Sequence, residues 1–191
     1  VDHLLDLRNE RRLVEAQIRD EETPVHQTTP ADVRNANKVC VIGQTLAKQM
    51  FAKANELDPL YARAYAGAAD CDSFLYLHYS EAVSIDDILT NCAKALNIDA
   101  GVAEARASRG LALSLSQRYE EAEQEFERAI ASDPNLFEGH YFYARACFVQ
   151  GKLEQAAYHW ERAAEIKPDD CQSAVLLVQV YDSLGQHEKG R

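Results

Sequence analysis

The side chains in this sequence that could bind a metal ion or act as nucleophiles are six histidines and five cysteines. The cysteines are odd in number, widely spaced and without a CxxC pair: Cys40, Cys71, Cys92, Cys147 and Cys171. We interpret them as reduced, buried helix residues. His140 and His159 could converge with Cys147 between two helices, but no two histidines are spaced as ligands on one helical turn. Surface or packing roles are therefore the simpler interpretation.

Catalytic motifs are also missing from the sequence. It contains no GxGxxG or GxxxxGKS/T phosphate loop, no HExxH metal motif and no GxSxG nucleophile motif. A catalytic site needs several groups that converge, and the spacing of the polar residues indicates no such constellation. We predict that the chain is not an enzyme and that it binds no cofactor and no metal.

The charge balance restricts the kind of partner. The 191 residues include 20 Lys or Arg and 31 Asp or Glu, which gives a formal charge of −11. Nucleic acids are bound through clusters of basic side chains, so a basic or amphipathic protein segment suits this chain better. No apolar run approaches the roughly 18 residues that a membrane helix needs. We therefore expect a soluble, cytoplasmic protein that binds neither nucleic acid nor membrane.

A repeat organises the C-terminal half of the chain. The same pattern of small, aromatic, small and proline residues occurs twice, 34 positions apart: Ala122, Phe126, Ala129 and Pro134, then Ala156, Trp160, Ala163 and Pro168. The first three members recur at i, i+4 and i+7, which places them on one face of a helix. The proline ends that helix because it lacks an N–H and clashes with the preceding turn. Gly151 and Gly185 stand where the two helices of a unit must be joined.

This pattern resembles the tetratricopeptide repeat family, whose 34-residue consensus is W-x2-L-G-x2-Y, then A-x3-F, then A and P. The second helices match well, whereas the first helices match loosely: Arg106 and Arg109 stand where Trp and Leu are usual. The resemblance implies an all-α fold, an α-solenoid of antiparallel helix pairs wound into a right-handed superhelix.

We divide the chain into an N-terminal helix at 1–20, a linker at 21–30 and a repeat array at 31–191. The N-terminal helix is expected to cap the first repeat or to form a homodimer contact. The array comprises a divergent repeat, a repeat with seven extra residues, two regular repeats and a truncated one: about 28–61, 62–102, 103–136, 137–170 and 171–191. Because both ends look cut, we expect a fragment of a longer protein.

Two local features are expected in the upstream repeats. A turn at Gly43 should end a first helix near 31–41. The seven extra residues should lengthen the helix or loop around 74–85. At the C-terminal end of this insertion, Ser84 and Asp87 have the spacing of a capping box, which predicts that a new helix begins there.

The resemblance also implies a function, since members of this family bind peptides or partner segments in a concave groove lined by the first helices. The groove positions selected in this chain are Arg63, Asp70, Glu104, Glu138, Tyr141, Phe142, Arg145, Phe148, Gln172, Gln179 and Asp182. The aromatic residues beside Arg145 predict an interface, because aromatic and Arg side chains dominate interface energies. The alternative for each of them is packing between repeats.

Family members that grip a chaperone's C-terminal carboxylate use a Lys and an Asn, then an Asn, then a Lys and an Arg, across three repeats. This chain has Ala, Leu, Glu and Val at the equivalent places, so we do not expect a chaperone tail as the partner. An interaction scaffold is the preferred interpretation. The stretch FAKANELDPLYARAYAGAADC resembles repeat regions of bacterial nucleotide cyclases and transcriptional regulators, which suggests a regulatory region instead. A third interpretation is an accessory region of an enzyme such as a glycosyltransferase.

Overall fold

The computed structural model describes the backbone of residues 30–78 and 83–186, and side chains from residue 43 onward except 44 and 78. Residue contacts divide the chain into two units, Val1–Val39 and Cys40–Arg191, and only the second is described in detail. The expected N-terminal helix and most of the linker lie outside the described residues. The described part is helical throughout, with helices α2 (Pro30–Leu57), α3 (Ala62–His78), α4 (Ile85–Ile98), α5 (Ala103–Leu115), α6 (Tyr119–Ser132), α7 (Phe137–Val149), α8 (Leu153–Ile166) and α9 (Cys171–Ser183).

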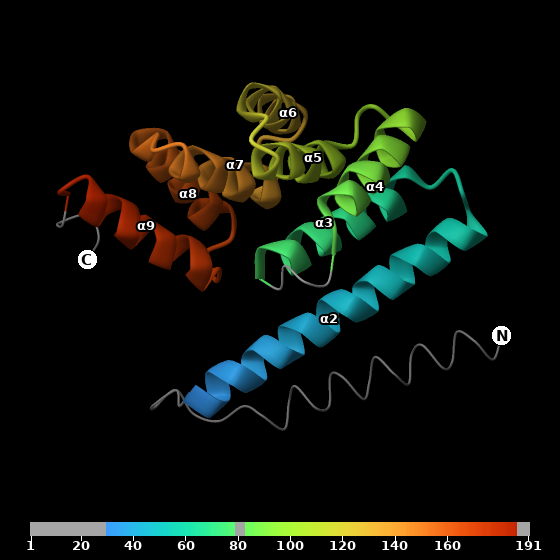
Figure 1. The fold of residues 1–191 in the computed structure, drawn as a ribbon, viewed down its shortest axis with the longest axis horizontal. Helices are drawn as coiled ribbons and strands as arrows, with labels where there is room; N and C mark the ends of the chain where they lie inside the picture. Colours follow the sequence, from blue (N-terminus) through green and yellow to red (C-terminus); the bar gives the residue numbers. More distant parts are fainter. Residues whose placement is uncertain (1–29, 79–82, 187–191) are drawn as a thin grey trace. The chain divides into compact units, whose positions relative to one another are not determined.

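Helices α3 to α9 form a chain of packed pairs (Figure 1). The first helix of each repeat packs against the second helix that follows it, in the pairs α3/α4, α5/α6 and α7/α8. The first helices also contact one another, α3 with α5 and α5 with α7, and α9 packs on α8. This order matches the expected solenoid of helix pairs.

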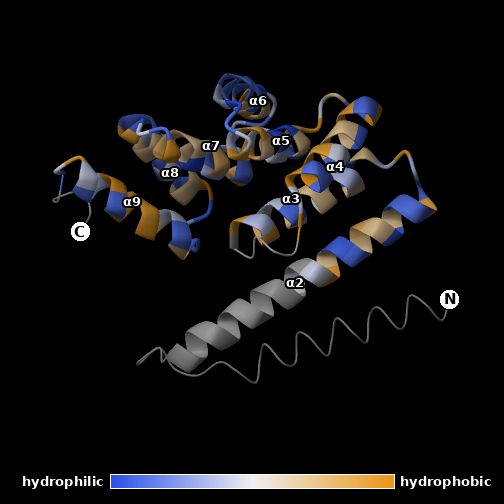
Figure 2. Cartoon of the chain, viewed as in Figure 1, coloured by the Kyte–Doolittle hydropathy of each residue, from blue (hydrophilic) through white to orange (hydrophobic). Residues whose placement is uncertain are grey.

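Small residues and one large aromatic fill the space within the pairs α5/α6 and α7/α8, as the sequence predicts. Ala122 and Ala129 are fully buried around Phe126, and the same positions of the next repeat are buried around Trp160. Gly110 shows why a small residue is needed in the first helix, because a Cβ atom there would lie only 2.7 Å from the Phe126 ring. Figure 2 shows polar and apolar residues mixed along the second helices, and the buried residues of α6 and α8 are mainly apolar.

The helix ends follow local sequence signals. Helices α6 and α8 end two residues before their prolines, at Ser132 and Ile166. Gly151 and Gly185 have positive φ angles of 75° and 69° in the turn after the first helix, as expected for glycine. Gln117 holds the same turn position one repeat earlier with φ 61°, where a side chain costs energy.

The seven extra residues of the repeat at 62–102 are shared between a helix and a connection. Helix α3 has 17 residues where α5 has 13, and residues 79–84 separate α3 from α4 where only 116–118 separate α5 from α6. The capping box is confirmed: Ser84 Oγ accepts a hydrogen bond from the Asp87 N–H, and Asp87 Oδ2 accepts one from the Ser84 N–H.

The turn predicted at Gly43 was wrong, because α2 runs through this residue without interruption. A glycine inside a helix costs only about 1 kcal/mol relative to alanine, so it does not by itself end one. A turn also needs a partner helix for the chain to fold back on, and the sequence pattern alone did not supply that information.

Candidate interaction surface

The predicted groove residues lie on four first helices and occupy repeated positions along them. The second residue of each helix is Arg63 on α3, Glu104 on α5, Glu138 on α7 and Gln172 on α9. We call the surface formed by the predicted groove residues the first-helix surface. Its exposed members are Arg63, Gln179 and Asp182, and its half-buried members are Asp70, Glu104, Glu138, Arg145, Phe148 and Gln172.

Within this surface, the carboxylates of two first helices act on a carboxyl group of a third. The pKa of Asp70 is raised to about 7, mainly because burial disfavours its charged form and also because Glu138 and Glu104 repel it. Lys167 opposes this effect. None of these three carboxylates forms a hydrogen bond or an ion pair with another described residue. The middle of the first-helix surface is therefore acidic, although the raised pKa of Asp70 reduces the charge that this residue carries near pH 7.

The aromatic residues of the first-helix surface are packed into the protein. Tyr141 and Phe142 are buried, and the Tyr141 hydroxyl donates a hydrogen bond of 3.0 Å to Gln172 Oε1. Phe148 is half-buried, with its ring 5.7 Å from that of Trp160. Packing within the α7/α8 repeat and against α9 thus accounts for most of this aromatic surface, and Arg145 beside it is half-buried.

Polar pairs join the two helices of a repeat, and the sequence indicated the approach of His140 and His159 but not the partner of Arg106. Arg106 Nη1 on α5 lies 3.1 Å from Glu125 Oε2 on α6, and both side chains are largely buried. One repeat later, His140 Nδ1 on α7 lies 3.1 Å from His159 Nδ1 on α8. Both pairs have a spacing of 19 residues, so alignment of the repeats could have indicated them. The Arg106 pair also explains why an arginine stands where the family usually has tryptophan.

A further buried charge joins α2 to α3. Asp72 is fully buried, its Oδ1 lies 2.5 Å from Lys48 Nζ, and its Oδ2 accepts a hydrogen bond of 3.3 Å from Asn91. The repeat consensus has an aromatic residue at the position of Asp72. In this repeat, an ion pair between α2 and α3 therefore stands where the consensus has aromatic packing.

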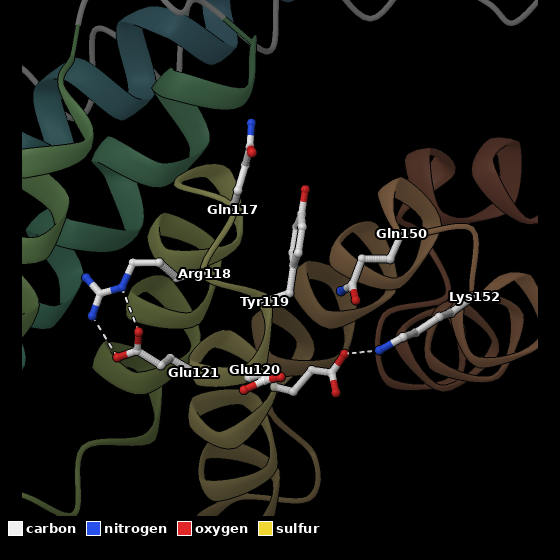
Figure 3. Close-up of a pocket in the computed structure, with 8 residues that line it drawn as sticks. Gln117, Arg118, Tyr119, Glu120, Glu121, Gln150 and Lys152 are labelled. Carbon is white, nitrogen blue, oxygen red and sulfur yellow. Dashed lines mark hydrogen bonds and ion pairs between the residues drawn. The ribbon is translucent and has the colours of Figure 1, made fainter.

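A polar pocket of about 510 Å³ lies at the edge of the array, between the α5–α6 and α7–α8 turns. Figure 3 shows Arg118 paired with Glu121 and Lys152 reaching a carboxylate, which belongs to Glu123. Because both of its cations already have carboxylate partners, the pocket presents no free positive charge to an anion. We assign no ligand to it.

The described residues contain no group of three or more His, Cys, Asp or Glu side chains that could hold a metal ion. Cys147 contacts the Gln155 side chain rather than the histidine pair. In the same part of the chain, no helix has both the length and the apolar character needed to cross a membrane.

The packing of successive antiparallel pairs, with first helices in contact along the array, defines an α-solenoid, a class of non-globular repeat protein. A model of the tetratricopeptide repeat matches residues 98–136 and 109–170. Residues 98–170 therefore carry tetratricopeptide repeats, and the all-α solenoid expected from the sequence is confirmed. No curated protein sequence matches the chain.

Several solved structures are similar in fold. The crystal structure of MamA has a TM-score of 0.55 at 17% identity, over 86% of this chain and 90% of that one. The first repeat domain of human RPAP3 has a TM-score of 0.53 at 19% identity, over 66% and 97%. The first repeat domain of Spaghetti (RPAP3), bound to the HSP90 peptide SRMEEVD, has 0.52 at 19%, over 63% and 93%. These likenesses show the shared fold.

Proposed function

We propose that this protein is a non-catalytic interaction scaffold that binds a basic or amphipathic segment of a partner protein in the concave groove of its first helices. The observation that carries the proposal is the group of three carboxylates, Asp70, Glu104 and Glu138, contributed by three successive first helices. A segment lying across these helices would meet all three. The overall charge of −11 would also attract a basic partner from solution.

The electrostatics of Asp70 favour a cationic side chain from the partner. Its charged form is disfavoured by burial and by repulsion from two neighbouring carboxylates. A Lys or Arg of the bound segment would reverse both effects, because an opposite charge within a few ångströms favours ionisation. Binding should therefore lower the pKa of Asp70 and release a proton near neutral pH.

The aromatic residues play a smaller part in this proposal. Tyr141 and Phe142 shape the floor of the groove through their packing, while Phe148 and Arg145 remain partly accessible to a bound segment. The apolar side of an amphipathic helix would contact the accessible part of Phe148.

The test uses the whole chain and three designed 15-residue amphipathic helical peptides that differ only in their polar residues, which are lysine, glutamate or glutamine. Isothermal titration calorimetry should detect binding of the lysine peptide and no binding of the glutamate peptide. The triple variant Asp70→Asn, Glu104→Gln, Glu138→Gln should bind the lysine peptide at least about tenfold more weakly, since three charge contacts of about 0.5 kcal/mol each sum to that factor.

A matched control removes the same charge from the second helices, through Glu120→Gln, Glu127→Gln and Glu154→Gln, which are all exposed on α6 and α8. This control variant should keep nearly the affinity of the wild type. If both triple variants weaken binding equally, the attraction is a property of the net charge. If the glutamine peptide binds as tightly as the lysine peptide, the carboxylates do not recognise the partner.

Two alternatives place the same array inside a larger protein. The sequence at 51–71 favours a regulatory region of a bacterial signalling protein, of the nucleotide cyclase or transcriptional regulator type. The second alternative is an accessory region of an enzyme. It is supported by similarity to the O-GlcNAc transferase of Thermobaculum terrenum, with a TM-score of 0.53 at 21% identity. The match covers 23% of that protein. In both alternatives, catalysis would come from another part of the protein.

A further inference from the structure

The histidine pair between α7 and α8 has a defined arrangement of protons. His140 Nε2 lies 3.2 Å from the carbonyl oxygen of Pro134, which can only accept, so this nitrogen carries a hydrogen and donates it. In a neutral imidazole the other nitrogen, Nδ1, is then an acceptor. It lies 3.1 Å from His159 Nδ1, which must therefore be the donor. Both histidines are neutral in this arrangement, and they join the two helices of one repeat.

The surroundings of the pair disfavour added protons. His140 is buried, and the ring of His159 is stacked on Tyr143 at 4.2 Å and lies edge-on to Tyr158 at 5.0 Å. Burial lowers the pKa of His140, the hydrogen bond to the Pro134 carbonyl opposes this effect, and the positive charge of Arg162 on α8 adds to it, so the pKa remains below its ordinary value. The pKa of His159 falls to about 4 through burial and the nearby His140.

The acidic residues of the neighbouring helix do not compensate for a charge on the pair. Glu123 and Glu127 on α6 act on Tyr143 rather than on either imidazole. One added proton still leaves a donor and an acceptor at this contact, but protonation of both rings would place two N–H groups against each other at 3.1 Å, which no change of tautomer relieves. The equivalent pair one repeat earlier is Arg106 with Glu125, in which opposite charges satisfy each other.

We propose that the His140–His159 hydrogen bond is a proton-sensitive joint that loosens the α7/α8 repeat when the solution is acidified. The unfolded chain takes up a proton on each histidine below pH 6.5, whereas the folded chain keeps them neutral to lower pH. Stability conferred by the joint is therefore complete above pH 6.5 and is lost as the pH falls toward 4. The proposal does not depend on the proposed function, because it concerns the repeat itself and not a partner.

The first test is a ¹⁵N NMR measurement of both imidazoles in the whole wild-type chain. We expect the Nε2–H tautomer for His140, the Nδ1–H tautomer for His159, no titration of His159 between pH 7.5 and 5.5 and a titration midpoint below pH 6.5 for His140. Titration of either ring near pH 6.5, or the opposite tautomer for His140, would overturn the proposal. This test needs no variant.

The second test measures urea unfolding of the wild type and of His159→Asn at pH 7.5 and pH 5. The Asn amide can donate to His140 Nδ1 in place of the imidazole but takes up no proton. Each histidine that stays neutral in the folded chain should raise the wild-type unfolding constant about 30-fold over this range. In the His159→Asn variant, the rise of the unfolding constant should be about 30-fold smaller than in the wild type, because one titrating histidine is gone. If stability depends on pH equally in the variant and in the wild type, the His140–His159 hydrogen bond is not proton-sensitive and the proposal is wrong.

The third test asks whether the opening is local and uses hydrogen exchange. At pH 5, amides of α7 and α8 should lose protection relative to those of α4 and α5, after correction for the intrinsic effect of pH. The double variant His140→Arg, His159→Glu copies the pair of the preceding repeat and should abolish this difference. Equal loss of protection in all helices would show that acid does not act through the joint.

Discussion

The Arg106–Glu125 pair allows the contribution of a buried charge inside one repeat to be measured. The side chain of Glu125 is 8% exposed and that of Arg106 is 18% exposed, so both are largely withdrawn from water. Arg106 also donates a hydrogen bond of 2.8 Å to the carbonyl oxygen of Ala100. We consider the single variants Arg106→Met and Glu125→Met and the double variant.

The expected magnitude follows from what each variant leaves behind. Removing one partner of a buried pair costs about 3–5 kcal/mol, because the other charge remains buried without compensation. Arg128, whose side chain is 59% exposed, still lies 3.1 Å from Glu125 and reduces this cost. We therefore expect Arg106→Met to lower the free energy of unfolding by about 2–3 kcal/mol. The double variant should lose only about 1 kcal/mol, since two thioethers pack without a stranded charge.

The assay is urea unfolding of the four proteins, followed by circular dichroism, and the quantity of interest is the coupling energy of the double-mutant cycle. The same cycle on Arg118 and Glu121 serves as the control, because this pair lies 2.6 Å apart on the surface and should show only weak coupling. If the two cycles give the same coupling energy, burial does not strengthen the Arg106–Glu125 pair and the reasoning is refuted.

Three further predictions concern packing, backbone strain and pH. Trp160→Ala should lower the free energy of unfolding by about 3–5 kcal/mol, because the ring is 1% exposed at the centre of its repeat; a variant that unfolds at the wild-type urea concentration would contradict this packing. Gln117→Gly should raise the free energy of unfolding by about 0.5–1 kcal/mol by removing a side chain from positive φ, whereas Gly151→Gln should lower it; the same sign for both would refute the strain argument. The carboxyl group of Asp70 binds a proton up to about pH 7 in the folded chain but only up to about pH 3.8 when unfolded, so stability falls as the pH rises between these values. Asp70→Asn should therefore raise the melting temperature at pH 8 and raise it less at pH 5, and thermal melts at the two pH values test this.

The helix pairs could be predicted because their signals are local in the sequence. The spacing of Ala156, Trp160 and Ala163 fixes the buried face of α8 without any knowledge of its partner. Pro168 and Gly151 act on their own backbone dihedral angles, and the capping box at Ser84 involves residues three apart. Signals of this kind require only the geometry of a helix or a turn.

The predicted surface residues show where such reasoning ends. The sequence placed Tyr141 and Phe142 on a first-helix face, but whether a side chain on that face is open or covered depends on how closely the next repeat packs. In the structure both are buried, and Tyr141 is tied to Gln172 of the following helix. Gly43 shows a second failure of local reasoning. Glycine is common in turns, but this glycine lies inside helix α2.

The sequence by itself determined the repeat period, the helix faces and most of the helix ends, because these depend on interactions between residues within one or two turns. The tertiary structure decided which polar and charged groups meet. Arg106 reaches Glu125, His140 reaches His159, and Asp70 lies near Glu104 and Glu138, because antiparallel pairing and stacking of the helices bring them together. Proximity of that kind depends on the packing distance and rotation between helices, and no local pattern in the sequence encodes either quantity.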